Sequence, residues 1–139
     1  MIENSPDEAF LIQRAFRKVP HPATVFICRN VPDATCYLQG KGVYTDRIKY
    51  PFPYAIISDL HMPAENGLDF LRWLGTEAQF NKIPVIILTG SSAPAQIKEA
   101  YDLGAANVLA KPPTLPALTA MINQLAEEWC TRAIQSKST

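Results

Sequence analysis

Residues 54–70, YAIISDLHMPAENGLDF, decide the fold of this chain, because a short apolar run changes there into a helical pattern. The run at 55–57 is typical of a parallel strand that is buried on both faces. Leucines then recur at helical spacing over 68–74, after the turn signal Asn66-Gly67. Asp59 therefore stands at the carboxyl end of a predicted strand, where open α/β sheets bind ligands. The alternative for a single strand-end aspartate is that it only opens a turn.

The overall composition is that of an ordinary globular domain. The 139 residues fit one domain, with 47% hydrophobic and 19% charged residues. Thirteen basic and thirteen acidic residues cancel to a formal net charge of zero, and no basic cluster marks a nucleic-acid partner. No apolar run approaches the roughly 18 residues of a membrane span, and the residues after Met1 do not form a signal peptide. We expect a cytoplasmic protein with no nucleic acid and no membrane among its partners.

The cysteines and histidines do not form the pattern of a zinc site. Cys28, Cys36 and Cys130 are odd in number and lack C-x-x-C spacing, which favours reduced thiols over a disulfide framework. His21 and His61 also stand apart from the cysteines and from each other. A zinc enzyme would therefore lack its ligands.

Short apolar strands alternate with helical segments along the chain. Strands are predicted at 24–28, 55–57, 83–88 and 107–110, after a stub at the extreme N-terminus. Helices are predicted to begin at the capping box Ser5-Pro6-Asp7-Glu8, at Val31, after Asn66-Gly67, at Pro94 and at Thr114. Residues 43–53 lack a clear period, and we expect an ordered loop there. The alternation predicts a doubly wound α/β domain over 1–130, followed by a polar tail at 131–139.

Polar residues follow four of the predicted strands where each strand ends. They are Glu3-Asn4, Asp59, Thr89 and Lys111. A carboxylate nucleophile beside acidic residues that hold Mg²⁺, a hydroxyl and an ammonium is what phosphoryl capture on aspartate requires. Each residue alone is a weak signal, because threonine is common in strands and lysine is usually a solvated charge. Their occurrence at successive strand ends is the stronger argument.

These motifs make the chain resemble the receiver domain of two-component response regulators over nearly its whole length. The motifs are Glu3-Asn4-Ser5-Pro6-Asp7-Glu8, Ser58-Asp59-Leu60-His61-Met62-Pro63 with Asn66-Gly67, Ile87-Leu88-Thr89-Gly90, and Lys111-Pro112. The resemblance implies a flavodoxin-like sheet of five parallel strands in the order 2-1-3-4-5, with the first strand truncated here. It also implies Asp59 as phospho-acceptor, with Thr89 and Lys111 as phosphoryl ligands. The implied metal is Mg²⁺, held by Glu3, Asn4, Asp59 and His61.

The resemblance also implies a role in signalling. The phosphoryl donor would be a sensor histidine kinase or a phosphotransfer protein, and the chain would be no enzyme beyond self-catalysed phosphoryl transfer and dephosphorylation. The short stretch after Lys111, together with Tyr101-Asp-Leu-Gly104 and Glu127-Glu128-Trp129, is similar to stand-alone receivers paired with bacterial phytochromes. We therefore expect a single-domain response regulator without an output module.

Three features depart from the family pattern. Asn4 stands where a second acid is usual, and Val108 stands where an aromatic switch residue usually precedes the lysine by three positions. Only Met1 and Ile2 precede Glu3, so most of the first strand is missing. We expect weaker Mg²⁺ binding and signalling without an aromatic flip. A monomer with a truncated central strand should be marginal, which predicts compensation by a homodimer.

Two hypotheses of function follow. The first is a phospho-accepting response regulator, which Asp59, Thr89 and Lys111 favour. The second is a pseudo-receiver, a protein-binding module of the same fold without phosphorylation, which Asn4 and Val108 favour. A small hydrolase is a distant third, because the sequence contains no G-x-S-x-G elbow.

Overall fold

The chain forms two compact units. The computed structural model describes residues 1–18, 24–61, 66–90, 93–111, 114, 116–117, 119–125 and 127–128. The first unit combines Met1–Asn4 with Phe26–Ala110, and the second combines Ser5–Val25 with Lys111–Thr139. The polar tail predicted at 131–139 lies outside the described residues, as do His21 and Cys130.

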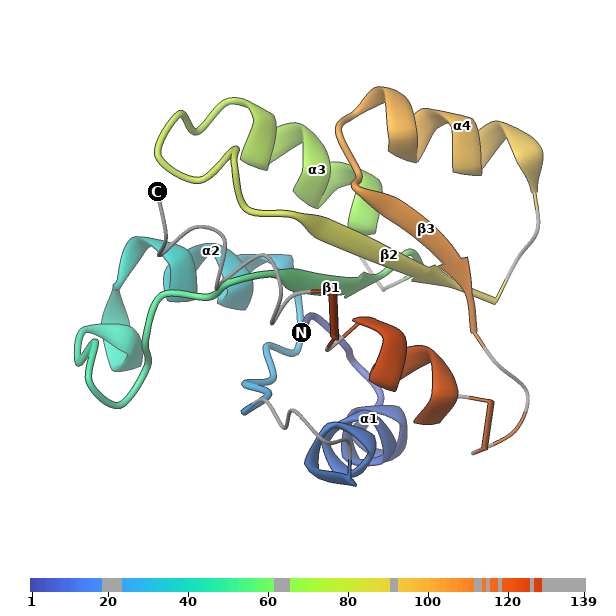
Figure 1. Cartoon of the computed structure of the whole chain (residues 1–139). Coiled ribbons are helices and arrows are strands. Elements are labelled where there is room, and N and C mark those ends of the chain that lie inside the picture. Colours follow the sequence, from blue (N-terminus) through green and yellow to red (C-terminus); the bar gives the residue numbers. More distant parts are fainter. Residues whose placement is uncertain are drawn as a thin grey trace. The chain divides into compact units, whose positions relative to one another are not determined.

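The first unit contains a parallel sheet in the predicted order. Strands β1 (Ile56–Asp59), β2 (Val85–Thr89) and β3 (Asn107–Ala110) pair in parallel in the order β1-β2-β3 (Figure 1). Ile2 adds parallel bridges to Cys28 and to Ser58, so it lies between the segment at Cys28 and β1. In chain order these five segments are 2-1-3-4-5, which confirms the flavodoxin-like arrangement.

Residues 1–3 occupy the central position of the sheet. On one side, Ile2 N donates to Ile57 O at 2.7 Å, and Asp59 N donates to Ile2 O at 3.0 Å. On the other side, Glu3 N donates to Cys28 O at 2.9 Å, and Cys28 N donates to Met1 O at 2.8 Å. At these positions the backbone N–H and C=O groups of both neighbouring segments are thus hydrogen-bonded. Compensation by a homodimer stays a prediction.

The buried strand predicted at 24–28 is wrong over most of its length. Only Cys28 makes a bridge, while Thr24 is exposed and residues 25–27 are half-buried. Phe26 O accepts from the amino group of Met1 at 2.8 Å, but residues 24–27 are not part of a regular strand. An apolar run forms a regular strand only where a partner supplies ladder bonds.

The first unit contains three α-helices and a short 3₁₀ helix among its described residues. They are α2 (Val31–Gln39), the 3₁₀ helix η1 (Gly42–Tyr44), α3 (Gly67–Gly75) and α4 (Pro94–Asp102). Side-chain caps begin α2 and α3. The Asn30 side chain accepts from Asp33 N at 2.8 Å. Asn66 and Asp69 form a reciprocal capping box, with both hydrogen bonds at 3.0 Å. Helices α3 and α4 lie side by side on one face of the sheet (Figure 1).

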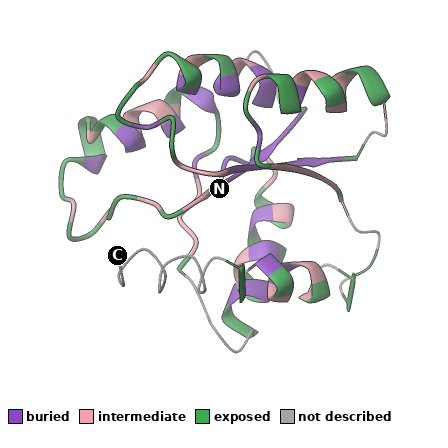
Figure 2. Cartoon of the chain, turned by 45° about the horizontal axis from the view of Figure 1, so that its top comes forward, coloured by how far each residue is buried: buried purple, intermediate pink, exposed green. Residues whose placement is uncertain are grey.

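The core of the first unit lies between the sheet and these helices. Every residue of β1 and β2 is buried, which matches the apolar runs of the sequence. Phe70 and Leu71 of α3 and Ile87 of β2 are at most 2% exposed. Figure 2 shows the buried residues concentrated in β1 and β2 and on the inner sides of the helices. The helical period over 68–74 therefore marks the face that covers the sheet.

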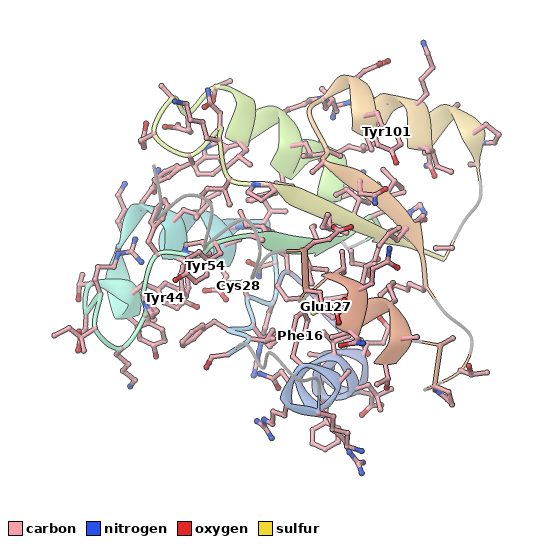
Figure 3. The ribbon with its side chains drawn as sticks, in the orientation of Figure 1. Phe16, Cys28, Tyr44, Tyr54, Tyr101 and Glu127 are labelled. Atoms are coloured by element: carbon pink, nitrogen blue, oxygen red, sulfur yellow. The ribbon has the colours of Figure 1, made fainter. Side chains whose placement is uncertain are left out.

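The segment 43–53 is an ordered loop, as predicted. The rings of Tyr44 and Tyr50 have centroids 5.0 Å apart, and Tyr37 of α2 lies 4.9 Å from Tyr44 (Figure 3). The Arg47 guanidinium lies 5.6 Å above the Tyr37 ring and donates to Tyr50 O at 3.2 Å. Aromatic packing, together with the cation–π contact and the hydrogen bond of Arg47, therefore orders this loop.

Cys28 provides a test of the buried core beside this loop. Burial raises the pKa of the Cys28 thiol from 9.0 to about 11, so about one thiol in a thousand is ionised at pH 8. Because the thiolate is the nucleophile, we expect iodoacetamide to modify half-buried Cys36 well before Cys28 in the native protein. The fold favours the protonated thiol. The contribution of Cys28 to the free energy of unfolding should therefore be fully present below pH 9.0 and be lost as the pH rises to about 11.

Peptide mass after a time course of alkylation measures both cysteines in one sample. Equal modification of Cys28 and Cys36 in native protein would contradict the burial. Equal modification after denaturation is the control.

The second unit begins with α1 (Pro6–Lys18). The Ser5 half of its predicted capping box is present, because Ser5 Oγ accepts from Glu8 N at 3.4 Å. Ile12 and Phe16 are buried on this helix. Residues 119–125 are helical, and Ile122 is fully buried. In the part of the chain that the structure describes, no helix is long and apolar enough to cross a membrane.

Candidate functional site

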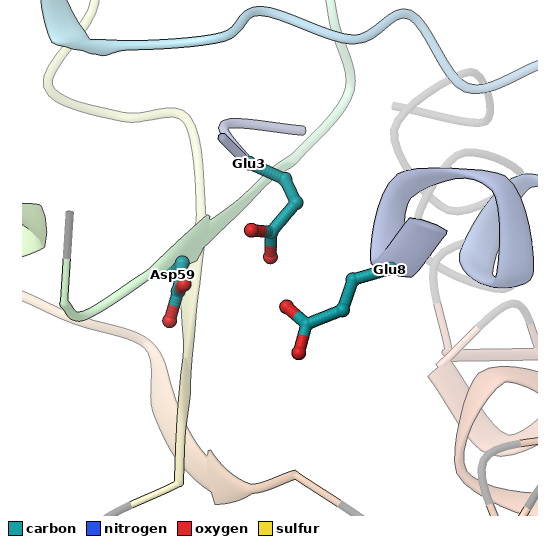
Figure 4. Close-up of side chains that lie close together, drawn as sticks. All are labelled: Glu3, Glu8 and Asp59. Atoms are coloured by element: carbon teal, nitrogen blue, oxygen red, sulfur yellow. The ribbon is translucent and has the colours of Figure 1, made fainter. Parts of the chain in front are cut away.

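The carboxylates of Glu3 and Asp59 lie together at the edge of the sheet in the first unit. Glu3 ends the stub strand and Asp59 ends β1. The bond from Asp59 N to Ile2 O fixes these two strand ends beside each other. Carboxylate oxygens of the two residues lie within 4.8 Å of one another (Figure 4). Glu3 is 1% exposed and Asp59 is 5% exposed.

Two buried carboxylates at this separation create a negative site. Their gross repulsion is about 3 kcal/mol at an effective dielectric of 20. Burial adds a desolvation cost to each charged carboxylate unless a positive partner or hydrogen bonds offset it. A hard divalent cation with oxygen ligands offsets both costs, so the pair of Glu3 and Asp59 has the right chemistry for such an ion.

Thr89 ends the strand next to Asp59. The register of β1 and β2 pairs Asp59 with Leu88, so Thr89 lies one residue further toward the same edge. Leu60 N donates to Leu88 O at 3.0 Å and continues the pairing beyond β1. Thr89 is 2% exposed. The structure therefore brings Glu3, Asp59 and Thr89 to one end of the sheet, as the strand-end argument predicts.

Lys111 directly follows β3 and belongs to the second unit. Its Nζ lies 2.7 Å from Oε2 of Glu8 in the first turn of α1. The Lys111 side chain is 25% exposed and the Glu8 side chain 45%. The sequence showed Glu8 only as part of a helix cap, because a contact between residues 103 positions apart has no spacing signal. Glu8 is therefore a candidate site residue that the sequence argument missed.

Asn4 and His61 are exposed, unlike the two carboxylates that they flank in sequence. Asn4 follows Glu3, and His61 is two residues after Asp59. Both positions are therefore open to solvent and to ions. Their roles as metal ligands stay predictions.

Val108 is a half-buried residue that packs against the core of the first unit. Its backbone N–H donates to Asn107 Oδ1 at 2.9 Å and to the Tyr101 hydroxyl at 3.2 Å. Tyr101, on α4, is 46% exposed (Figure 3). An aromatic side chain therefore lies against the start of β3, although it comes from α4 and not from position 108. Signalling without a flip at position 108 stays a prediction.

Gly67 allows α3 to begin directly against the backbone of Asp59. A Cβ at position 67 would lie 2.7 Å from the Asp59 carbonyl oxygen and 3.3 Å from Leu60 Cα. Gly67 N also donates to Leu60 O at 3.1 Å. The sequence marks Asn66-Gly67 as a turn signal, but the close approach to Asp59 is visible only in the structure. Gly67 thus sets the path of the chain after Asp59.

Gly67→Ala is expected to destabilise the protein by about 1 to 3 kcal/mol, because the obstructing atoms belong to the backbone and cannot rotate away. Gly75→Ala is the matched control in the same helix, since its added Cβ meets no atom within 4 Å beyond its chain neighbours and the backbone of its own helix. The control should be neutral or stabilising by up to about 1 kcal/mol. Urea unfolding gives the free energy of unfolding of both variants. Equal values for Gly67→Ala and Gly75→Ala would contradict the close approach of Gly67 to Asp59.

Comparison with known proteins places the chain among signalling domains. The model of the response regulator receiver domain matches residues 2–123. Response regulator Rcp1 of Synechocystis sp. is 26% identical over 129 residues, which cover 93% of this chain and 86% of that protein. A probable chemotaxis protein CheY of Rhizobium etli is 41% identical over 84 residues, which cover 60% of this chain and 62% of that protein.

Solved structures agree with this family. The phosphorylated cyanobacterial phytochrome response regulator RcpA has a TM-score of 0.84 at 26% identity, over 94% of this chain and 91% of that one. The Mn²⁺-bound form of response regulator Rcp1 has a TM-score of 0.80 at 26% identity, over 92% of this chain and 90% of that one. The predicted resemblance and the flavodoxin-like fold are confirmed. The chain therefore belongs to the response regulator receiver domain family.

Proposed function

We propose that this chain accepts a phosphoryl group on Asp59 in a two-component phosphorelay. The observation that supports this most is the position of Asp59, buried at the end of β1 beside Glu3 and next to the end of β2. A turn-opening aspartate has no need of a second buried carboxylate beside it. The relatives include a phosphorylated phytochrome response regulator and chemotaxis proteins, which are signalling proteins of this family.

In the proposed reaction, a carboxylate oxygen of Asp59 attacks the phosphorus of a phosphohistidine on a sensor histidine kinase or phosphotransfer protein. The new O–P bond forms as the N–P bond breaks, and the histidine nitrogen keeps the electron pair of that bond. We assign the Thr89 hydroxyl and the Lys111 ammonium to the oxygens of the transferred group, which they would bind by hydrogen bonds and charge. The chain would act in the cytoplasm, where such kinases present their phosphohistidine.

The buried carboxylates of Glu3 and Asp59 fit a divalent cation, and we assign Mg²⁺ to them. A related protein has been solved with Mn²⁺ bound. When bound, the ion neutralises charge on the phosphoryl oxygens. Because Mg²⁺ prefers oxygen, Asn4 would contribute its amide oxygen and His61 its backbone carbonyl, not its exposed imidazole.

The direct test is incubation with phosphoramidate and Mg²⁺, followed by intact mass. Phosphoramidate is chosen because its P–N bond resembles that of phosphohistidine and because it does not acylate lysine. The proposal predicts the gain of one phosphoryl group, and a much slower gain when Mg²⁺ is removed with a chelator. A chain that stays unmodified with phosphoramidate and with a phosphorylated kinase would instead be a pseudo-receiver.

A further inference from the structure

The ion pair between Lys111 and Glu8 is a contact that the proposed reaction does not use. Nζ of Lys111 donates to Oε2 of Glu8 at 2.7 Å, the distance of a charge-assisted hydrogen bond. The pair joins the residue after β3 to the first turn of α1, and both residues belong to the second unit. Lys111 therefore already has a carboxylate partner in the unphosphorylated protein.

The surroundings of Glu8 suit an exchangeable partner. Its side chain is 45% exposed, so water competes for the carboxylate and the pair is not locked by burial. Its backbone N–H is engaged by Ser5 Oγ, which keeps the first turn in place whichever partner the carboxylate has. Asn4, four residues earlier, contributes no charge, so Glu8 supplies a carboxylate to a segment that lacks its usual second acid.

We propose that Glu8 is a positioning residue that holds Lys111 in the unphosphorylated protein and releases it when Asp59 is phosphorylated. This inference rests on the proposed function. A phosphoryl group carries about two negative charges and three acceptor oxygens, whereas Glu8 offers one charge. The ammonium of Lys111 therefore exchanges its weaker partner for a stronger one. Glu8 sets the resting position of Lys111 and competes with the phosphoryl group for it.

Acetylation of Lys111 by limiting acetic anhydride measures the pair without any phosphorylation. Peptide mass gives the modified fraction in wild type, in Glu8→Gln and in Asp7→Asn. Asp7→Asn is the matched control, because it removes one charge from the same helical turn at an exposed position. Glu8→Gln should increase acetylation of Lys111 about two- to fivefold, as loss of a partly exposed pair implies, and Asp7→Asn should leave it unchanged.

Phosphorylation then tests the release. Glu8→Gln should take a phosphoryl group from phosphoramidate about two- to fivefold faster than Asp7→Asn. The reason is that Lys111 no longer has to break an ion pair with a carboxylate before it binds the phosphoryl group. Once Asp59 is phosphorylated, wild type and Glu8→Gln should show the same acetylation of Lys111. Glu8→Asp keeps the charge on a shorter side chain and should restore part of the protection of Lys111.

Two results would overturn the inference separately from the proposed function. Equal acetylation of Lys111 in unphosphorylated wild type and Glu8→Gln would show that Glu8 does not hold it. Equal phosphorylation rates of Glu8→Gln and Asp7→Asn would show that no competition occurs. If wild type accepts no phosphoryl group at all, the proposed function fails and the release fails with it, while the acetylation comparison still decides the pairing.

Discussion

Asp59→Asn is expected to abolish phosphorylation by phosphoramidate, with a loss of rate of at least about a thousandfold. An amide has no anionic oxygen to attack phosphorus and cannot form an acyl phosphate. The substitution is nearly isosteric and removes the repulsion between Asp59 and buried Glu3, so the variant should fold at least as stably as wild type. Intact mass over a time course, with a thermal melt of the same sample, measures both effects.

Asp7→Asn is the control for this substitution, because it makes the same chemical change at an exposed position on α1. It should accept the phosphoryl group within about twofold of the wild-type rate, as an exposed charge predicts. An Asp59→Asn variant that is modified as fast as Asp7→Asn would place the acceptor elsewhere.

Asn4→Asp is expected to tighten Mg²⁺ binding about ten- to a hundredfold, or about 1.4 to 2.8 kcal/mol. The gross attraction of one added charge at 4 Å is about 4 kcal/mol at an effective dielectric of 20. Repulsion from the carboxylates of Glu3 and Asp59 offsets part of that gain. The exposed position of Asn4 leaves space for a cation and its waters. Calorimetric titration of wild type and variant with MgCl₂ gives the ratio of affinities.

Asn81→Asp is the matched control for the added charge, because Asn81 is exposed and lies in the turn before the amino end of β2, opposite the carboxyl ends that carry Asp59 and Thr89. Its Mg²⁺ affinity should equal that of wild type. Equal affinities of Asn4→Asp and wild type would show that position 4 contributes no ligand to the metal.

Most of the strand positions and part of the candidate site could be predicted because they depend on local pattern, whereas the prediction of the strand order rests on the resemblance to receiver domains. Continuous apolar runs specify β1 and β2, since strands buried on both faces tolerate no polar alternation. The change of period after such a run locates the strand end, and with it Asp59 and Thr89. Parallel pairing then brings those ends together without any further information from the sequence.

The parts that sequence could not predict depend on contacts between distant segments. The run at 24–28 has a strand composition, yet within it only Cys28 forms a bridge, to Ile2. Gly67 is recognisable as a turn residue, but its close approach to the Asp59 carbonyl follows from how α3 packs. The pair of Glu8 and Lys111 depends on where the chain returns after β3. In each case a tertiary partner decides what the local pattern leaves open.

Borohydride trapping of the phosphorylated protein tests the central claim most directly. Borohydride reduces an aspartyl phosphate to homoserine, so peptide mass assigns the modified residue without any substitution in the protein. After treatment with phosphoramidate and Mg²⁺, we expect homoserine at position 59 and at no other aspartate. Homoserine at another aspartate, or phosphate that stays on a histidine, serine or threonine with Asp59 intact, would contradict Asp59 as the phospho-acceptor.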